Sequence, residues 1–98
     1  MLSGLITVGM YYDVVPGKEE EFESDFTTVA HILESVPGHA QSRLFRDVFR
    51  PGSYLIYSEW ESREAFGAFA RSPEFAMARR WGDDVLLGAP RHTILTPN

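Results

Sequence analysis

Residues 54–75 decide the fold, and they read Tyr54-Leu-Ile-Tyr-Ser-Glu-Trp-Glu-Ser-Arg-Glu-Ala-Phe-Gly-Ala-Phe-Ala-Arg-Ser-Pro-Glu-Phe75. The run up to Trp60 is rich in aromatic and branched side chains, which is typical of a β-strand. Ser62 then offers an N-cap for a helix through Arg71, and Ser72 with a proline behind it offers a second N-cap. The stretch therefore predicts a strand that runs directly into a helical region broken into two pieces.

Three Pro-Gly pairs divide the rest of the chain, at residues 16–17, 37–38 and 51–52. Proline presets a turn and glycine supplies a positive φ, so each pair marks a boundary between elements. Apolar residues recur at helical spacing after the first pair, and alternating or β-rich runs predict strands elsewhere. The expected elements are a strand at 5–15, a helix at 18–35, strands at 39–48 and 53–60, the helical region from 62 to its end at 88–90, and a last strand at 91–96.

The order β-α-β-β-α-β is the split βαβ arrangement of ferredoxin-like domains, which belong to the α+β class. A chain of 98 residues is long enough for one layer of helices on one sheet, so we expect a single domain over residues 1–98. Hydrophobic residues make up 44% of the chain and aromatic residues 13%, which is ample for a packed interior.

Composition and charge exclude several classes of function. The net charge is −5 and Lys18 is the single lysine, so the chain offers no basic stripe for nucleic acid or anionic lipid. It has no cysteine, which excludes disulfides, thiol nucleophiles and thiolate metal sites. The apolar run at residues 2–10 is short and lacks a basic leader, so it predicts a strand and not a signal peptide or membrane span. We therefore expect a cytoplasmic protein with no nucleic-acid or membrane partner.

The two faces of the expected sheet differ, and the difference predicts a partner. The side chains expected to face the helices are Ile6, Val8, Met10, Ile56 and Trp60. Those that would then face away are Leu5, Tyr11, Phe45, Leu55 and Tyr57. Such a face is too apolar to leave in water over a few hundred Å². We expect two subunits to pack these faces together in an isologous homodimer and to form one barrel from both sheets.

The segment Tyr57-Ser-Glu-Trp-Glu-Ser-Arg-Glu-Ala-Phe66, followed by Ser72-Pro-Glu-Phe75, resembles the antibiotic biosynthesis monooxygenase family of dimeric α+β barrels. The pair Pro37-Gly38 before the second strand also fits that family. The resemblance implies a monooxygenase, an enzyme of the oxidoreductase class. The family includes cofactor-independent oxygenases of polycyclic aromatic phenols and quinols as well as haem-degrading enzymes.

Individual cavity positions match this family only in part. In its aromatic-polyketide oxygenases, a tryptophan at the strand–helix junction matches Trp60, but the cavity asparagine and tyrosine are replaced by Ile56 and Phe66. In its haem-degrading branch, an asparagine, a tryptophan and the haem-ligating histidine are replaced by Met10, Phe69 and Arg79. The resemblance therefore disfavours haem degradation of that type, although another histidine could serve as ligand.

Trp60, Arg79 and His92 are the candidate catalytic residues. Trp60 could stack on a flat aromatic substrate or simply fill the core. Arg79 lies about 40° from the apolar stripe of its helix, so its guanidinium could bind an anionic or carbonyl oxygen at a cavity mouth, or form a surface ion pair. His92 lies on the last strand, where alternation does not decide its facing; it could act as a base or be an ordinary surface residue. Tyr12 could offer its phenol to the cavity.

The remaining polar residues are two further histidines and an acidic run. His31 should face solvent. His39 opens the second strand just after a turn, and like His92 it could act as a base or be an ordinary surface residue. The three histidines of the chain show no metal-ligand spacing, so we predict no metal site. The acidic run at residues 19–23 suits a solvated helix start, where the helix dipole favours anions.

The leading prediction is a cofactor-independent monooxygenase that acts on a small aromatic phenol or quinol in an apolar cavity between helices and sheet. The expected substrate-binding residues are Met10, Tyr12, Ile56, Phe66 and Phe69. One alternative is a non-catalytic module that binds a hydrophobic ligand or has a regulatory role. Another is a haem-binding or haem-degrading member with a different ligand set.

Overall fold

The computed structural model describes residues 5–82 and 84–95. Its elements follow in the order β1 (Ile6–Asp13), α1 (Glu19–Leu33), β2 (His39–Arg46), β3 (Ser53–Trp60), α2 (Arg63–Ala70), α3 (Pro73–Gly82) and β4 (Arg91–Leu95). This is the predicted β-α-β-β-α-β order, with the second helical region in two pieces. The α+β ferredoxin-like fold is confirmed.

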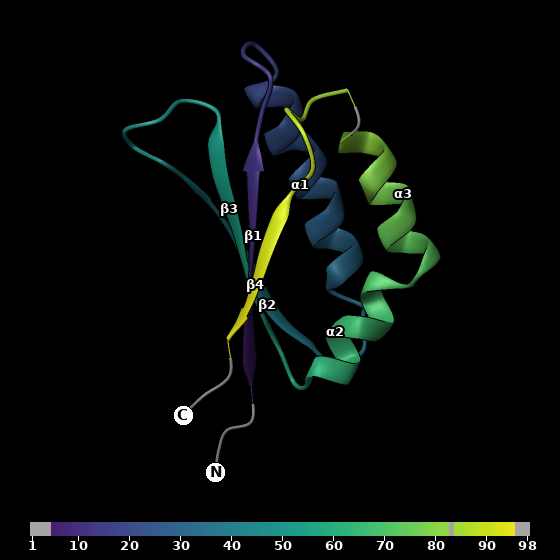
Figure 1. The fold of residues 1–98 in the computed structure, drawn as a ribbon. Coiled ribbons are helices and arrows are strands. Elements are labelled where there is room, and N and C mark those ends of the chain that lie inside the picture. Colours follow the sequence, from purple (N-terminus) through teal and green to yellow (C-terminus); the bar gives the residue numbers. More distant parts are fainter. Residues whose placement is uncertain (1–4, 83, 96–98) are drawn as a thin grey trace.

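The four strands form one antiparallel sheet in the order β2-β3-β1-β4. The central strands β1 and β3 pair over their whole length, from Ile6 opposite Trp60 to Asp13 opposite Ser53. Strand β4 pairs with the other side of β1 and sets His92 opposite Met10. The helices α1, α2 and α3 cover one face of the sheet and leave the other face open (Figure 1).

The break between α2 and α3 comes from two serine caps. Ser62 Oγ accepts a hydrogen bond from the backbone N–H of Ala65 at 3.1 Å, and α2 begins at the next residue. Ser72 Oγ accepts one from the N–H of Phe75 at 3.2 Å, and Pro73 is the first residue of α3. Proline has no N–H, so it suits a first helical turn but disrupts a continuous helix. Both predicted helix starts are confirmed.

The turn before β2 packs directly against α2. Gly38 has a φ of +84°, and a Cβ at this position would overlap the Cβ of Ala65. Gly17 has a similar φ of +91°, but nothing lies within 4 Å of a Cβ placed there. Gly38 is therefore required both by its backbone conformation and by the close approach of the helix.

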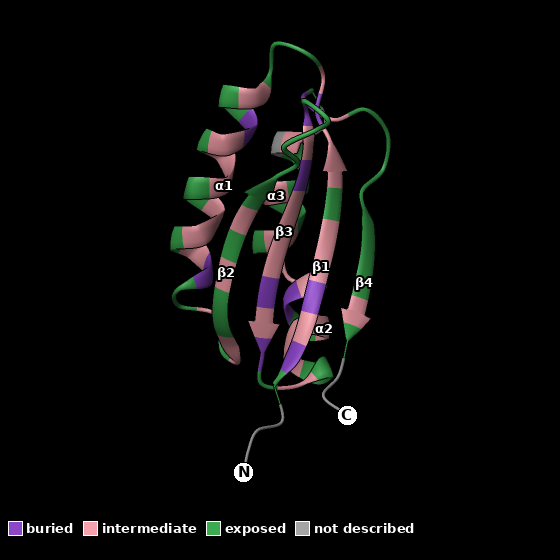
Figure 2. Cartoon of the chain, turned by 90° about the vertical axis from the view of Figure 1, so that its left-hand side faces the viewer, coloured by how far each residue is buried: buried purple, intermediate pink, exposed green. Residues whose placement is uncertain are grey.

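The core lies between the helices and the two central strands. One cluster of buried side chains consists of Ile6, Val8, Leu33, Trp60 and Phe69. A second cluster consists of Val14, Phe22, Tyr54 and Val85. In Figure 2 the buried positions of the sheet follow β1 and β3, whereas the edge strands β2 and β4 are exposed or intermediate. The inner-face residues predicted from alternation all belong to these clusters or pack against them.

Strand β2 ends at Arg46 and not at the predicted Val48. The reason is a side-chain turn, because the Asp47 carboxylate accepts hydrogen bonds from the N–H groups of Phe49 and Arg50 at 2.8 and 3.2 Å. These bonds offer the backbone an alternative to strand pairing. The side chains of Val48 and Phe49 are left 85% and 89% exposed in the hairpin loop.

The helix ends also differ from the prediction. Helix α1 ends at Leu33, two residues before the predicted end at 35. Helix α3 ends at Gly82 and not near residues 88–90. After it the chain turns back to the sheet, where the carbonyl of Val85 accepts a hydrogen bond from the N–H of Val15 at 2.7 Å. The predicted last position of the final strand, Thr96, and residues 2–4 of the first apolar run lie outside the described residues.

Candidate active-site cavity

A cavity of about 410 Å³ lies between the sheet and the helices. Its walls come from β1, β2, β3 and β4 on one side and from α1, α2, α3 and the segment before β4 on the other. The lining is mostly aliphatic and aromatic. Its side chains from α1 and α3 include Phe22, Phe26, Val29, Leu33, Phe75 and Ala78. Such an apolar pocket with a few polar groups is the usual form of a small-molecule site.

The structure brings all the predicted site residues together around this cavity. The lining includes Met10, Tyr12, Ile56, Trp60, Phe66, Phe69, Arg79 and His92. They come from five separate elements that the topology places around one space. Their catalytic and substrate-binding roles stay predictions, because lining a cavity does not by itself assign chemistry.

Trp60 forms the floor of the cavity and is only 1% exposed. Its indole N–H donates a hydrogen bond to Ser58 Oγ at 3.0 Å, so its polar atom is satisfied inside the core. The rings of His39, Phe66 and Phe69 lie at centroid distances of 5.1, 5.5 and 5.4 Å from it. The structure therefore gives Trp60 a core role, and stacking on a ligand stays a prediction.

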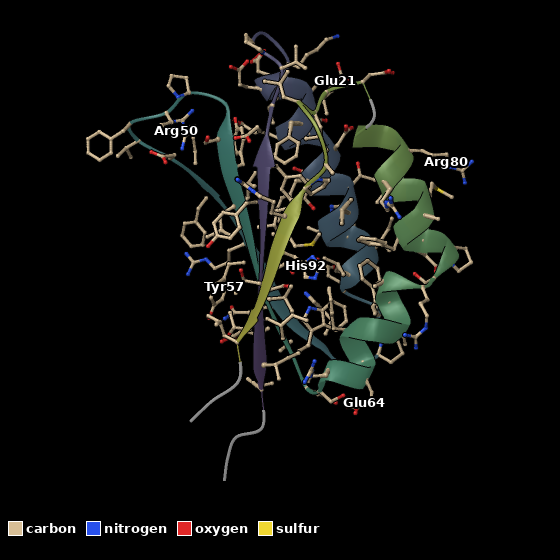
Figure 3. All side chains as sticks on the ribbon, in the orientation of Figure 1. Glu21, Arg50, Tyr57, Glu64, Arg80 and His92 are labelled. Carbon is tan, nitrogen blue, oxygen red and sulfur yellow. The ribbon has the colours of Figure 1, made fainter. Side chains whose placement is uncertain are left out.

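Arg79 and His92 lie where the cavity opens, and both are exposed. His92 sits opposite Met10 in the β1–β4 pair, and directly opposed residues of antiparallel strands point to the same face. This pairing decides the facing that alternation along β4 could not. Figure 3 shows His92 pointing from β4 toward the helices and Arg80 on the outer side of α3. Arg79 lines the cavity and Arg80 does not, as predicted.

Tyr12 brings a phenol to the cavity wall, but this phenol is not poised as a base. Burial raises the pKa of Tyr12 to about 12, so its hydroxyl stays protonated at neutral pH. The hydroxyl lies 3.6 Å from the Sδ atom of Met10, to which it donates a weak hydrogen bond. Tyr12 therefore contributes a protonated hydroxyl to the cavity wall, and its donor is used within the protein.

Asp25 is a cavity-lining residue that the sequence analysis missed. It lies on α1, three residues after Phe22 and four before Val29, and all three line the cavity. Burial raises the pKa of Asp25, and the charge of Glu21 one turn earlier raises that pKa further. The signal was present in the sequence, because a carboxylate at helical spacing within an apolar stripe is unusual.

The other histidines lie outside the cavity lining. His39 packs its ring against Trp60 from behind and shares a hydrogen bond with Ser42 Oγ at 2.8 Å. Burial lowers the pKa of His39, although hydrogen bonds to the backbone act in the opposite direction. His31 faces solvent as predicted and lies 3.9 Å from a Glu34 carboxylate oxygen. Among the described residues, no group of three or more histidines and acids is placed to hold a metal ion.

The acidic run at the start of α1 is not wholly solvated. Glu23 is intermediate in exposure and accepts a hydrogen bond from the hydroxyl of buried Tyr54. Glu19 accepts one from the backbone N–H of Gly17 at 2.9 Å, which ties the turn to the first residue of the helix. Within residues 5–82 and 84–95, no helix combines the length and the apolar character that crossing a membrane requires.

Comparison with known proteins gives consistent results. The family model described as antibiotic biosynthesis monooxygenase matches residues 5–81. A Halobacterium salinarum protein named "putative heme-binding protein" is 40% identical over 93 residues, which cover 95% of this chain and 19% of that protein. A Mycobacterium tuberculosis protein named heme oxygenase (mycobilin-producing) is 38% identical over 64 residues, which cover 65% of this chain and 61% of that protein.

Among solved structures, SnoaB from Streptomyces nogalater, described as a cofactor-independent oxygenase, superposes with a TM-score of 0.86 at 23% identity. The match covers 98% of this chain and 95% of SnoaB, and it shows a shared fold. The chain spans about a fifth of the length of the Halobacterium relative, so that relative's name does not say which of its parts binds heme.

Proposed function

This chain belongs to the antibiotic biosynthesis monooxygenase family, and from that premise we propose that it is an oxygenase for a small, flat phenol or quinol. The substrate binds in the cavity between the helices and the sheet. The cavity volume of about 410 Å³ falls toward the lower end of the roughly 300–1,000 Å³ usual for small-molecule sites. A flat ligand of a few rings suits such a space, and the aromatic walls suit its faces.

The proposed reaction needs no resident cofactor. A base removes the proton of the substrate's phenol or enol hydroxyl, and the resulting anion, whose resonance form is a carbanion, reduces O₂ and forms a C–O bond with it at carbon. The hydroperoxide then loses water, so that one CH₂ group and one O₂ become one C=O group and one H₂O. The protein supplies deprotonation, a dry space and correct orientation.

The observation that carries this proposal is the pair Arg79 and His92 at the open side of a mostly apolar cavity. The guanidinium of Arg79 stabilises the enolate oxygen as charge develops. His92 takes up and releases protons at the same open side of the cavity. Trp60, Met10, Tyr12, Ile56, Phe66 and Phe69 provide the floor and walls that hold the rings and keep out water.

Oxygen uptake tests the proposal. We expect the protein to consume one O₂ per anthrone, or per hydroquinone of a substrate panel, above the rate without protein. Arg79→Gln should lower kcat by about 100-fold, the usual effect of removing one oxyanion partner. The matched control is Arg80→Gln, one residue further along the same helix but pointing away from the cavity. Its kcat should stay within about twofold of the wild-type value.

Two results would count against an oxygenase. Equal rates for the two arginine variants would remove Arg79 from the mechanism. A folded protein that binds these ligands but consumes no oxygen would be a non-catalytic ligand-binding module, the alternative class.

Haem binding is a second candidate, favoured by the names of the relatives at 40% and 38% identity. His92 is the one histidine among the described lining residues, and neutral imidazole is a common haem-iron ligand. Arg79 would pair with a haem carboxylate at the open side. Haem, when bound, would supply O₂ activation at its iron. The limited cavity volume, and the replacement of two residues of the haem-degrading branch by Met10 and Phe69, favour a phenol or quinol over the larger haem.

A hemin titration separates the two candidates. Saturable one-to-one binding with a shifted Soret band, lost in His92→Ala and kept in His31→Ala, would favour haem. His31 is the matched control because it is solvent-exposed and does not line the cavity. Absence of specific binding would leave the phenol or quinol oxygenase.

The proposed assembly is a homodimer through the open face of the sheet. That face carries Leu5, Tyr11, Phe45, Leu55 and Tyr57, and among them Tyr11 and Phe45 are 43% and 45% exposed. The hairpin loop between β2 and β3 projects on the same side, away from the helices (Figure 1). An apolar sheet face of this kind gains free energy when a second copy covers it.

A further inference from the structure

Asp25 is the one acidic residue among the cavity-lining side chains of the described chain. It is half-buried on α1, between the aromatic and aliphatic residues of the stripe that faces the sheet. Burying a carboxylate beside Phe22 and Phe26 costs free energy unless a partner compensates. Within residues 5–82 and 84–95, the structure shows no hydrogen bond or ion pair to this carboxylate.

The charged and titratable groups around Asp25 leave room for a ligand. Glu21 on the same helix raises the pKa of Asp25, in addition to the larger effect of burial. The other charged or titratable side chains that line the cavity are Arg79 on α3, His92 on β4 and Tyr12 on β1. Arg79 carries the opposite charge, yet no N–O contact within 4.0 Å joins it to Asp25 in the part of the chain described. Two opposite charges therefore line one apolar space without neutralising each other.

The other polar lining groups already have partners within the protein. Ser58 accepts the indole N–H of Trp60, Ser42 bonds to the ring of His39, and Tyr12 donates to a methionine sulfur. Inside the lining, a ligand would therefore find Asp25, Arg79 and His92 available for strong hydrogen bonds.

We propose that Asp25 is the proton acceptor of this cavity and that, with Arg79, it selects flat aromatic ligands carrying a free hydroxyl at one edge and a carbonyl or oxyanion at another. The inference rests on the proposed function and gives it a general base and a substrate class. The carboxylate of Asp25 accepts the hydroxyl hydrogen bond. As the substrate reacts, its O–H bond breaks, the electron pair stays on the ring oxygen, and the proton forms an O–H bond on Asp25. Arg79 donates hydrogen bonds to the oxygen at the other edge.

A binding cycle that needs no turnover tests the hydroxyl contact. The probes are 2-naphthol and naphthalene, which differ by one hydroxyl, and the proteins are the wild type, Asp25→Asn and Asp25→Leu. We expect Asp25→Leu to weaken 2-naphthol about tenfold or more, because a hydrogen bond to a charged group is lost. The affinity for naphthalene should change by less than about threefold. Asp25→Asn keeps a hydrogen-bond acceptor but loses the charge, so its affinity for 2-naphthol should lie between those of the wild type and Asp25→Leu.

The control variant is Glu20→Gln, which removes an exposed acid of the same helix that does not line the cavity. It should leave both affinities unchanged, and circular dichroism should show all variants folded. If Asp25→Leu changes the two affinities equally, the assignment of Asp25 is overturned. The assignment is also overturned if the wild type binds neither probe saturably, because the cavity then does not accept flat aromatics.

Oxygen uptake distinguishes the failure of this inference from the failure of the proposed function. Hydroxyl selectivity that depends on Asp25, without oxygen consumption by the wild type, would keep the binding role of Asp25 and sink the oxygenase. Oxygen consumption that is unchanged in Asp25→Asn, with the same dependence on pH as the wild type, would keep the oxygenase and sink Asp25 as its base.

Discussion

Replacing Trp60 with alanine tests whether the floor of the cavity is also the centre of the core. The side chain is 1% exposed and contacts three other rings, so its removal takes away buried area and leaves a space that the core fills only in part. Substitutions of this kind cost about 3–5 kcal/mol. The loss is a large share of the roughly 5–15 kcal/mol that stabilises a typical domain.

The assay is urea unfolding followed by far-ultraviolet circular dichroism, because the variant loses one of the two tryptophans that fluorescence would follow. A loss of about 4 kcal/mol corresponds to a drop in Tm of roughly 15–30 °C for a domain near this size. The matched control is Phe49→Ala, which removes an aromatic side chain that is 89% exposed. That control should change the free energy of unfolding by no more than about 0.5 kcal/mol.

A loss below about 1 kcal/mol in Trp60→Ala would refute the core role, because a fully buried tryptophan cannot be removed so cheaply. The same reasoning decides how to test the ring in catalysis. Trp60→Ala would confuse loss of stacking with loss of fold, so Trp60→Phe is the better variant for turnover. It keeps an aromatic ring against the neighbouring side chains and removes only the indole N–H and part of the area.

Three further predictions concern other parts of the chain. Burial lowers the pKa of His39 in the folded protein from its ordinary 6.5, so between the folded and unfolded pKa values the unfolded chain binds more protons, and the free energy of unfolding falls as the pH drops through that window. Urea unfolding near pH 5 and pH 7.5 should therefore show a smaller change in the free energy of unfolding for His39→Gln than for the wild type. An equal change in both proteins would contradict this. Gly38→Ala should lower the free energy of unfolding by at least about 1 kcal/mol more than Gly17→Ala does, because both residues have a positive φ but only Gly38 packs against α2. Similar melting temperatures for the two variants would contradict the close contact. Phe45→Glu should convert a dimer to a monomer in analytical ultracentrifugation by placing a charge in the proposed interface. The control is Met77→Glu, which changes a side chain of similar exposure on the helical side and should leave the dimer intact. The proposed interface is wrong if both variants stay dimeric.

Much of the fold could be predicted because its signals are local. The caps at Ser62 and Ser72 and the turn glycines act within a few residues of themselves, so the two-piece helix and the order of strands follow from short segments. The end of α3 could not be predicted in this way. It depends on the burial of Val85 against the end of β1, a contact between segments about 70 residues apart.

The candidate site also contains residues that local patterns predicted and residues that only the tertiary structure placed. Alternation along β1 and β3 placed Met10, Tyr12 and Ile56 on the inner face, and helical periodicity directed Arg79 toward the cavity. The facing of His92 required its register against β1, since a strand of five residues carries too little alternation. Asp25 was passed over because helical spacing shows that a residue belongs to an apolar stripe, but not whether that stripe meets packed side chains or an open cavity.

The sequence by itself determined the elements, their order and the family, because caps, turns and periodicity are properties of neighbouring residues. Only the tertiary structure decided that Asp25, Arg79 and His92 line one apolar space without pairing with each other. The physical reason is that electrostatics and solvation depend on distances between residues far apart in the chain. Those distances exist only after the helices have packed on the sheet.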